Sequence, residues 1–171
     1  MRLSHYTLLY IVATLWLAVG CDNTPIIETQ KQAAPNYKEN IINANRVVSE
    51  AEHTQIEGYI SRRGWAMTHL PDGASFDEYQ RGAGNPLSDE DTAVLQYSIE
   101  TLTGQTIYSH RSDTIIVGHH QPNLGIDQTI KHLRRGSKAR IILPSSLAYG
   151  MVGDGDRVPA MTVLVYDMLV Q

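Results

Sequence analysis

The sequence predicts an α+β protein, in which an antiparallel twisted sheet packs on one short helix and follows an N-terminal helical extension. Apolar residues recur at helical spacing up to Arg63, whereas after Gly64 they alternate in short runs. One further helical pattern, with apolar residues at 126, 130 and 133, interrupts those runs and has strands on both sides. Strands that flank one helix, without regular strand–helix alternation, favour an antiparallel sheet.

The first residues have the composition of an export signal. Arg2 gives a positive start, and Tyr6–Val19 is almost without polar groups but shorter than the ~20 apolar residues of a spanning helix. Small residues then precede Cys21, which resembles the lipobox of bacterial lipoproteins. The resemblance implies that residues 1–20 are a lipoprotein signal peptide and that Cys21 carries the lipid. A plain secretory signal with a free thiol, or a short uncleaved anchor, is the alternative.

The segment that follows Cys21 predicts a tether and then a helix. Residues 21–37 are polar, contain two prolines and lack a period, so we expect a flexible tether. Residues 38–63 are expected to form a helical extension whose firm part is Glu50–Arg63, because Ser49 and Glu52 have the form of a capping box. Its apolar stripe has two candidate partners, the following domain and a second copy of itself.

From Gly64 the chain predicts the strands of one domain, residues 64–171. Residues 72–91 are rich in Gly, Asp and Pro and predict irregular or edge structure, and Ser145–Val158 predicts a long glycine-containing loop. The expected strands are Trp65–His69, Thr92–Thr101, Thr106–Ser109, Thr114–Val117, Lys138–Leu143 and Thr162–Val170. The last strand is apolar on both faces apart from Asp167, as a central strand over a helix is.

Composition argues against several classes of function. The formal net charge is −4, which disfavours a nucleic-acid-binding surface. A single cysteine excludes an internal disulfide framework and a cysteine-rich metal site. The adjacent His119 and His120 are expected to point apart in a solvated turn, so no metal site is predicted. The basic residues between 131 and 140 are expected to lie exposed to solvent at a helix end and on a strand face.

The C-terminal part of the chain carries a family pattern. Leu133–Val170 combines a helix end with Gly, a strand, Pro-x-x-x-Ala-Tyr-Gly, a Gly-containing loop, an aliphatic–Pro step and a final strand that ends aromatic–Asp. In this order, these elements resemble the C-terminal half of FKBP-type peptidyl-prolyl isomerase domains. The likeness extends back through Asn123–Ile126 and Val94–Tyr97. With segment 97–109 and the Ser49 helix, the chain is most similar to the gliding-motility-associated lipoprotein FKBPs of bacteria.

The resemblance implies an FKBP-like sheet wrapped around the short helix, with an apolar pocket between them. Tyr149 at the rim, with its hydroxyl toward the ligand, and Tyr97 on one wall are the expected catalytic residues. The expected substrate-binding residues are Ile107, Tyr108, Ile115, Ile126, Val158 and Tyr166. Ile107 and Tyr108 stand where most members have Phe-Asp, and the loss of both predicts reduced activity. Taken as isolated aromatics, Tyr97, Tyr149 and Tyr166 are better interpreted as ordinary core residues, and it is the surrounding motif that favours a site role.

The resemblance implies isomerisation of X-Pro bonds in proline-containing segments of exported client proteins. With the lipid anchor, this predicts a periplasm-facing protein of the bacterial cell envelope, at the outer membrane. No cofactor, metal or nucleic acid is expected, because the reaction needs only that the twisted amide be favoured. The alternative is a non-catalytic FKBP-fold chaperone or peptide-binding assembly module of the envelope. A homodimer formed through the N-terminal helix is a further reading.

Overall fold

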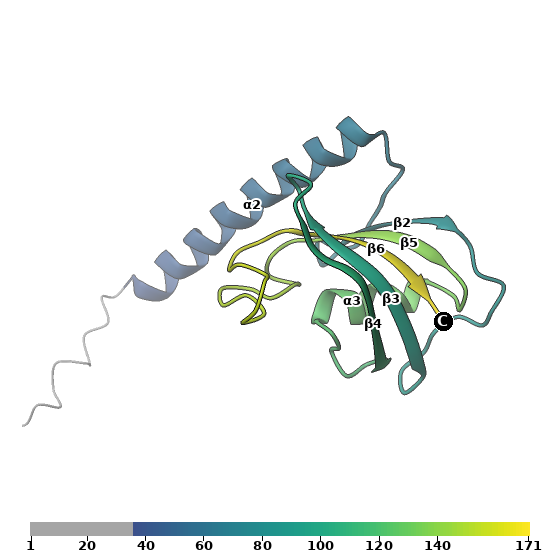
Figure 1. Ribbon diagram of the computed structural model, residues 1–171. Coiled ribbons are helices and arrows are strands. Elements are labelled where there is room, and N and C mark those ends of the chain that lie inside the picture. Colours follow the sequence, from purple (N-terminus) through teal and green to yellow (C-terminus); the bar gives the residue numbers. More distant parts are fainter. Residues whose placement is uncertain (1–35) are drawn as a thin grey trace, which may run out of the picture. The chain divides into compact units, whose positions relative to one another are not determined.

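The computed structural model describes residues 36–171 (Figure 1). Its elements are α2 (Tyr37–Arg63), β1 (Thr68–His69), β2 (Ser75–Gln80), β3 (Thr92–Thr101), β4 (Thr106–Ile116), α3 (Leu124–Thr129), a 3-10 turn (Ile130–His132), β5 (Lys138–Leu143) and β6 (Leu164–Val170). Cys21, the predicted signal peptide and the predicted tether up to residue 35 lie outside the described residues. Within residues 36–171, no helix is long and apolar enough to cross a membrane.

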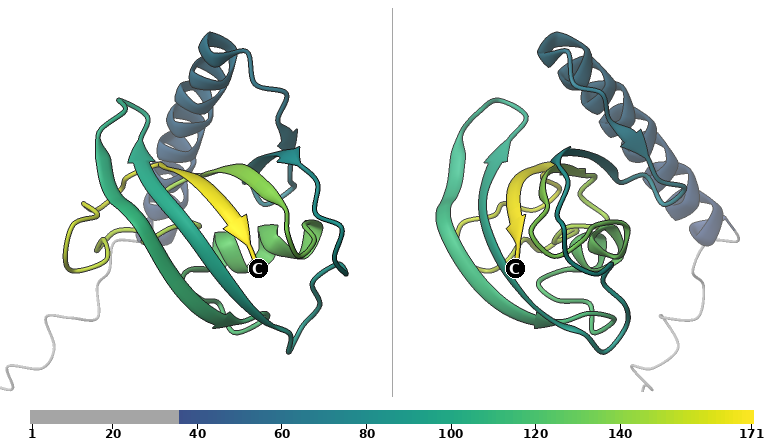
Figure 2. Two further views of the ribbon diagram at one scale, coloured as in Figure 1. Left: turned by 45° about the vertical axis from the view of Figure 1, so that its right-hand side comes forward. Right: turned by 90° about the vertical axis from the view of Figure 1, so that its right-hand side faces the viewer.

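Six strands form one sheet in the order β1-β2-β5-β6-β3-β4. Every pair of neighbours is antiparallel. The sheet curves around the short helix α3 (Figure 2). The predicted antiparallel α+β fold is therefore confirmed, and the curvature creates the concave face on which the site is built.

β3 has the alternation that its sequence predicts. Leu95, Tyr97 and Ile99 are buried in the main core, whereas the intervening side chains are less buried. β3 pairs with β6, where Tyr97 lies opposite Met168 and Ile99 lies opposite Tyr166. Side chains directly opposite in an antiparallel pair share a face of the sheet. This register places the Tyr97 and Tyr166 side chains on the same concave face.

β6 is apolar on both faces because two separate cores meet it. Tyr166 and Met168 belong to the main core under the concave face, whereas Val165 belongs to a second core. In that second core, the apolar side chains of α2 pack against β5, β6 and the residues before β6; its buried members are Ile56, Tyr59, Ile60, Ile142, Val163 and Val165. From Ile42 onward, the helical extension is part of the same compact unit as the sheet.

The helical extension begins earlier than its firm part was expected to begin. α2 is one continuous helix of 27 residues, with Ser49 and Glu52 in its interior. The capping-box interpretation of these two residues is wrong, because the preceding residues contain no Gly or Pro to stop the helix. The carboxylate of Glu52 accepts a hydrogen bond from the backbone N–H of Ser145 instead.

Two strands differ from the prediction. β4 runs without interruption over Thr106–Ile116, where two strands with a polar gap were expected, because β3 pairs with it on both sides of a register shift between Tyr97 and Ile99. β2 forms at Ser75–Gln80, inside the stretch expected to be irregular or edge structure, because β1 and β5 pair with it. β1 keeps only two residues of the strand expected at Trp65–His69.

The short helix packs tightly onto the concave face. Asn123 caps α3 by accepting from the N–H of Ile126 at 3.0 Å, and Ile126, Ile130 and Leu133 are fully buried, as their spacing predicts. A Cβ added at Gly125 would lie 2.7 Å from a methyl carbon of Leu143. The glycine therefore permits the close approach of α3 to β5 that sets the depth of the site.

Candidate functional site

The structure brings the eight predicted site residues together around one core. They come from β3 (Tyr97), β4 (Ile107, Tyr108, Ile115), α3 (Ile126), β6 (Tyr166) and the loop between β5 and β6 (Tyr149, Val158). Seven belong to the main core with at most 9% of their surface exposed, and Tyr149 is half-buried against it. In this arrangement Tyr149 is the member that presents surface to a ligand. A prolyl ring reaches the other seven only if the covering side chains move.

The backbone around Tyr149 is fixed on both sides. Residues 144–150 form a tight turn, in which the N–H of Gly150 donates to the carbonyl of Ser145 at 2.8 Å. The carbonyl of Gly150 accepts from the N–H of Met161, also at 2.8 Å, which joins the two ends of the long loop. Because Tyr149 directly precedes Gly150, its ring is held at the edge of the concave face.

Tyr97 has a carboxylate partner that the sequence did not indicate. Its hydroxyl donates to Asp113 of β4. In the β3–β4 register Leu95 lies opposite Asp113 and Tyr97 lies opposite Arg111, so both polar β4 residues are aligned with inward-facing residues of β3. Burial, and then the hydrogen bond and charge of Asp113, raise the pKa of Tyr97 well above its ordinary value. Asp113 thus supplies a carboxylate inside the site, although position 108 lacks the family's Asp.

Tyr166 lies beside Tyr97 and has its own buried partner. The two rings are 5.6 Å apart between centroids, tilted by 50°. The side-chain amide of Asn123 donates to the Tyr166 hydroxyl at 2.9 Å. Burial, together with the neighbouring Tyr149 and Tyr97, raises the pKa of Tyr166 well above its ordinary value. Three tyrosine side chains therefore meet at one end of the site, and the raised pKa values keep Tyr97 and Tyr166 neutral at physiological pH.

Tyr108 ties β4 to the loop between β5 and β6. Its hydroxyl donates to Asp154 at 2.5 Å and lies 3.1 Å from a carboxylate oxygen of Asp156. The hydrogen bond to Asp154, then burial and the bond to Asp156, raise the pKa of Tyr108 to about 12. The side chain is 7% exposed, so in this arrangement it closes the loop over the concave face.

Asp154 organises the same loop from within. One of its carboxylate oxygens accepts from the backbone N–H groups of residues 156, 157 and 158 at 2.8–2.9 Å. Burial acts to raise the pKa of Asp154, but the hydrogen bonds from Tyr108 and these N–H groups outweigh it and hold the pKa at about 2. Asp154 therefore stays ionised at every physiological pH, and the loop conformation is fixed by a charged acceptor.

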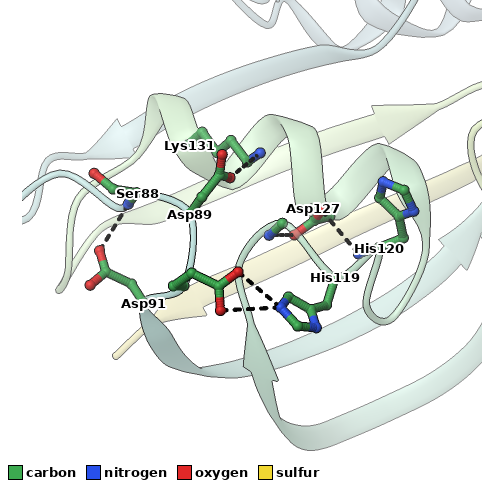
Figure 3. Close-up of polar contacts among 9 residues, drawn as sticks. Ser88, Asp89, Asp91, His119, His120, Asp127 and Lys131 are labelled. Atoms are coloured by element: carbon green, nitrogen blue, oxygen red, sulfur yellow. Dashed lines mark hydrogen bonds and ion pairs between the residues drawn. The ribbon is translucent and has the colours of Figure 1, made fainter.

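A second polar cluster joins α3 and the 3-10 turn to the turn at residues 118–120 and to the segment before β3 (Figure 3). His119 faces Glu90 at 3.2 Å, whereas the His120 side chain points elsewhere and its backbone N–H donates to Asp127. Lys131 pairs with Asp89 at 2.5 Å. Among residues 36–171, no group of three or more His, Cys, Asp or Glu side chains could hold a metal ion. The contacts of this cluster fix the turn at residues 118–120 and the start of β3.

Sequence reasoning missed four polar residues of the site. Asn123, Asp113, Arg111 and Asp154 contact or surround the tyrosines, and none was singled out beforehand. A signal existed for two of them. Arg111, Asp113 and Ile115 alternate along one face of β4, so the strand carries two charged residues in line with a buried one. The polar run was interpreted as a gap between strands, which hid this pattern.

Comparison with known proteins identifies the fold. The profile of the family described as FKBP-type peptidyl-prolyl cis-trans isomerase matches residues 84–171, about half of the chain. The chain belongs to this family. Its FKBP match begins after β2 and includes all eight predicted site residues.

Curated FKBP relatives match over short segments. Human FKBP9 is 34% identical over 68 residues, which cover 40% of this chain and 12% of FKBP9. FK506-binding protein 2 of Dictyostelium discoideum is 36% identical over 52 residues, 30% of this chain and 39% of that protein. The matches therefore span only a small part of the length of these relatives.

Solved structures of FKBP-fold proteins superpose on this chain. A peptidyl-prolyl cis-trans isomerase from Pseudomonas syringae aligns with a TM-score of 0.60 at 23% identity, over 73% of this chain and 92% of that one. FkpA from Escherichia coli aligns with a TM-score of 0.59 at 19% identity, over 99% and 82% of the two chains. At this identity the likeness establishes the shared fold.

Proposed function

We propose that this FKBP domain catalyses the cis–trans isomerisation of X-Pro peptide bonds. The observation that carries the proposal is the position of Tyr149. Within the family-matched segment, its half-exposed side chain stands beside Tyr97 and Tyr166 at the edge of an otherwise buried apolar cluster. An apolar site with a few placed polar groups suits a proline ring and its amide.

The reaction demands little conventional catalytic chemistry. Rotation about a peptide C–N bond costs about 18–20 kcal/mol because amide resonance must be broken. The planar amide is the more polar state, so a dry site raises its free energy more than that of the twisted state. A lowering of the barrier by about 7 kcal/mol corresponds to roughly five decades of rate. No nucleophile, metal or general base is needed.

Each site residue has a role in this scheme. The Tyr149 hydroxyl donates to the carbonyl of the residue before proline and holds the backbone while the amide turns. Tyr97 and Tyr166 form the aromatic wall, with their own hydroxyls held by Asp113 and Asn123. Once the covering side chains move, the remaining substrate-binding residues supply apolar surface for the ring; these are Ile107, Tyr108, Ile115, Ile126 and Val158.

The proposed setting is the bacterial cell envelope. Arg2, the apolar stretch 6–19 and the small residues before Cys21 support export and lipidation at that cysteine. The chain would then face the periplasm, at the outer membrane, and act on proline-containing segments of exported proteins. Segment 97–109 and the helix around Ser49 support a place among the gliding-motility-associated lipoprotein FKBPs. Cys21→Ser is expected to move the protein from the membrane fraction to the supernatant.

A protease-coupled assay on an Ala-Leu-Pro-Phe peptide tests the isomerase proposal. Acceleration above background is expected, and Tyr149→Phe is expected to lower kcat/KM. The control is Tyr79→Phe, which removes a tyrosine hydroxyl that pairs with Asp167 on the opposite side of the sheet. Absence of acceleration at micromolar protein would remove the enzymatic assignment.

A second candidate function is peptide binding without catalysis. It is favoured by the burial of seven of the eight site residues, which leaves little open surface for a proline ring. A binding module of this kind suppresses the aggregation of unfolded clients, and that effect survives Tyr149→Phe. Loss of both effects in the same variant would argue against separate binding.

A further inference from the structure

Two arginine side chains lie over the ring of Tyr108 at the edge of the candidate site. The guanidinium carbon of Arg111 is 4.5 Å from the ring centroid, and that of Arg157 is 5.4 Å away. Arg111 comes from β4, and Arg157 comes from the loop that also carries Tyr149. Both residues are exposed. A stacked guanidinium uses its face for the ring and keeps its N–H edge for a further partner.

The neighbouring carboxylates already have partners. Asp154 accepts from three backbone N–H groups and from the Tyr108 hydroxyl, which also contacts Asp156, and Asp113 accepts from Tyr97. Within the part of the chain that the structure describes, neither Arg111 nor Arg157 has a carboxylate at ion-pair distance. The groups at the entrance that lack a partner of opposite charge are therefore the two guanidinium groups, which are cationic hydrogen-bond donors. A planar carboxylate is the group that fits them.

Arg111 also lies close to the place where the substrate carbonyl is proposed to bind. Burial acts to lower the pKa of its guanidinium, but the nearby Tyr97, Asp113, Tyr108 and Tyr149 outweigh it and raise the pKa. Arg111 is also paired with Tyr97 in the β3–β4 register, and Tyr97 lies at the same end of the site as Tyr149. The carbonyl that Tyr149 is proposed to hold belongs to the residue before proline. The side chain of that residue branches one bond from this carbonyl, within reach of the arginine.

We propose that this site selects substrates in which an acidic residue, Asp or Glu, directly precedes proline. This proposal rests on the proposed isomerase function. Arg111 and Arg157 are the specificity-determining residues, and they bind the substrate carboxylate. At longer range the three nearby aspartates outnumber the two arginines, so selection acts through contact at the site rather than through steering from solution. High salt weakens such an exposed pair but leaves the apolar contacts intact.

The test compares two peptides that differ only in charge, Ala-Glu-Pro-Phe and Ala-Gln-Pro-Phe. Exposed ion pairs are individually weak, so two of them predict a kcat/KM ratio of about three to ten in favour of the Glu peptide. The double variant Arg111→Gln with Arg157→Gln is expected to bring the ratio to about one. Arg157→Glu is expected to bring the ratio to one or below. Arg81→Gln, an exposed arginine at the end of β2, is the matched control and keeps the wild-type ratio.

The outcomes separate this proposal from the one on which it rests. A ratio of one in the wild-type protein, with both peptides accelerated, overturns the acidic preference and leaves the isomerase function standing. A ratio that persists in the double variant overturns the assignment to these arginines. If neither peptide is accelerated, the isomerase function fails, and the same peptides are compared by their dissociation constants in an NMR titration. Tighter binding of the Glu peptide then supports the arginine site, and equal binding overturns it.

Discussion

The carboxylate of Glu52, in the interior of α2, accepts a hydrogen bond of 3.0 Å from the backbone N–H of Ser145. Both residues are buried. Ser145 lies near the start of the tight turn at residues 144–150, where its carbonyl accepts a hydrogen bond from the N–H of Gly150. The N-terminal helix therefore contacts the segment that holds Tyr149. A helix that sequence reasoning assigned to an extension is, through this bond, part of the support of the candidate site.

We expect Glu52→Ala to lower the free energy of unfolding by about 2 kcal/mol, because the buried Ser145 N–H is left without an acceptor. If the proposed function holds, kcat also falls, since the turn that carries Tyr149 loses its anchor. Glu52→Gln keeps an acceptor oxygen and is expected to recover most of both losses. Urea unfolding and the peptide assay, at a temperature where all variants are folded, measure these effects.

The control for Glu52 is Glu50→Ala on the same helix. Glu50 is exposed, and its partner Arg46 lies 3.9 Å away in a solvated pair, so its removal is expected to cost less than about 0.5 kcal/mol. Equal losses from the two alanine variants would mean that the Ser145 bond contributes nothing specific.

A pair of glycine substitutions tests how tightly α3 packs. We expect Gly125→Ala to destabilise the fold by about 1–3 kcal/mol, because the new Cβ would lie 2.7–2.8 Å from both methyl carbons of Leu143 and 3.0 Å from the Cβ of Leu147. This strain exceeds the gain of up to about 1 kcal/mol that alanine brings to a helix. Gly58→Ala in α2 meets only the flexible end of Arg62, at 3.2 Å, and is expected to stabilise. Thermal unfolding of both variants decides the sign.

The regular elements could be predicted because their buried residues recur at the spacing typical of a strand or a helix. Leu95, Tyr97 and Ile99 alternate and are buried, and Ile126, Ile130 and Leu133 repeat at helical spacing and are buried. β2 could not be predicted, because Asp77 and Glu78 make its pattern polar and its pairing with β5 is decided by residues far along the chain. The helical extension was predicted over nearly its full length, but its firm part was expected to begin only at Glu50, because a plausible capping box at Ser49 suggested a helix start there.

The candidate site was predictable only where a family motif covers it. The Ala-Tyr-Gly motif indicated Tyr149, and the resemblance brought in its apolar neighbours. The polar partners could not be found in this way, because Asp113 lies sixteen residues from Tyr97 and acts through the β3–β4 register. Asp154 likewise meets Tyr108 only when the long loop folds back on β4.

We expect Asp113→Asn to lower the pKa of Tyr97. Asp113 raises this pKa through its hydrogen bond and its charge, and asparagine keeps an acceptor but not the charge. The pKa stays above the ordinary value because burial, its largest cause, remains. Alkaline difference absorption at 295 nm, compared between the wild type and the variant, measures the shift. An unchanged tyrosine titration would contradict the pairing of Tyr97 with Asp113.

The link between Tyr108 and Asp154 predicts a dependence of stability on pH. In the folded protein the pKa of Asp154 is about 2, below the ordinary 3.8. A carboxyl whose pKa is depressed by folding contributes stability that is present above the ordinary value and is lost as the pH falls toward the folded value. Tyr108→Phe removes one of the hydrogen bonds that lower this pKa. The difference in unfolding free energy between the wild type and this variant is therefore expected to shrink from pH 4 to pH 2.

At alkaline pH the dependence of stability on pH has the opposite sign. The pKa of Tyr108 is raised to about 12, so its contribution is present below the ordinary value of 10.0 and is lost as the pH rises through 12. An NMR titration of the Asp154 carboxyl carbon checks the acid side directly, with Tyr79→Phe as the control that leaves Asp154 unchanged. If Asp154 titrates near 3.8 in the wild-type protein, Tyr108 does not hold the loop closed, and the other six buried site residues must be covered by something else.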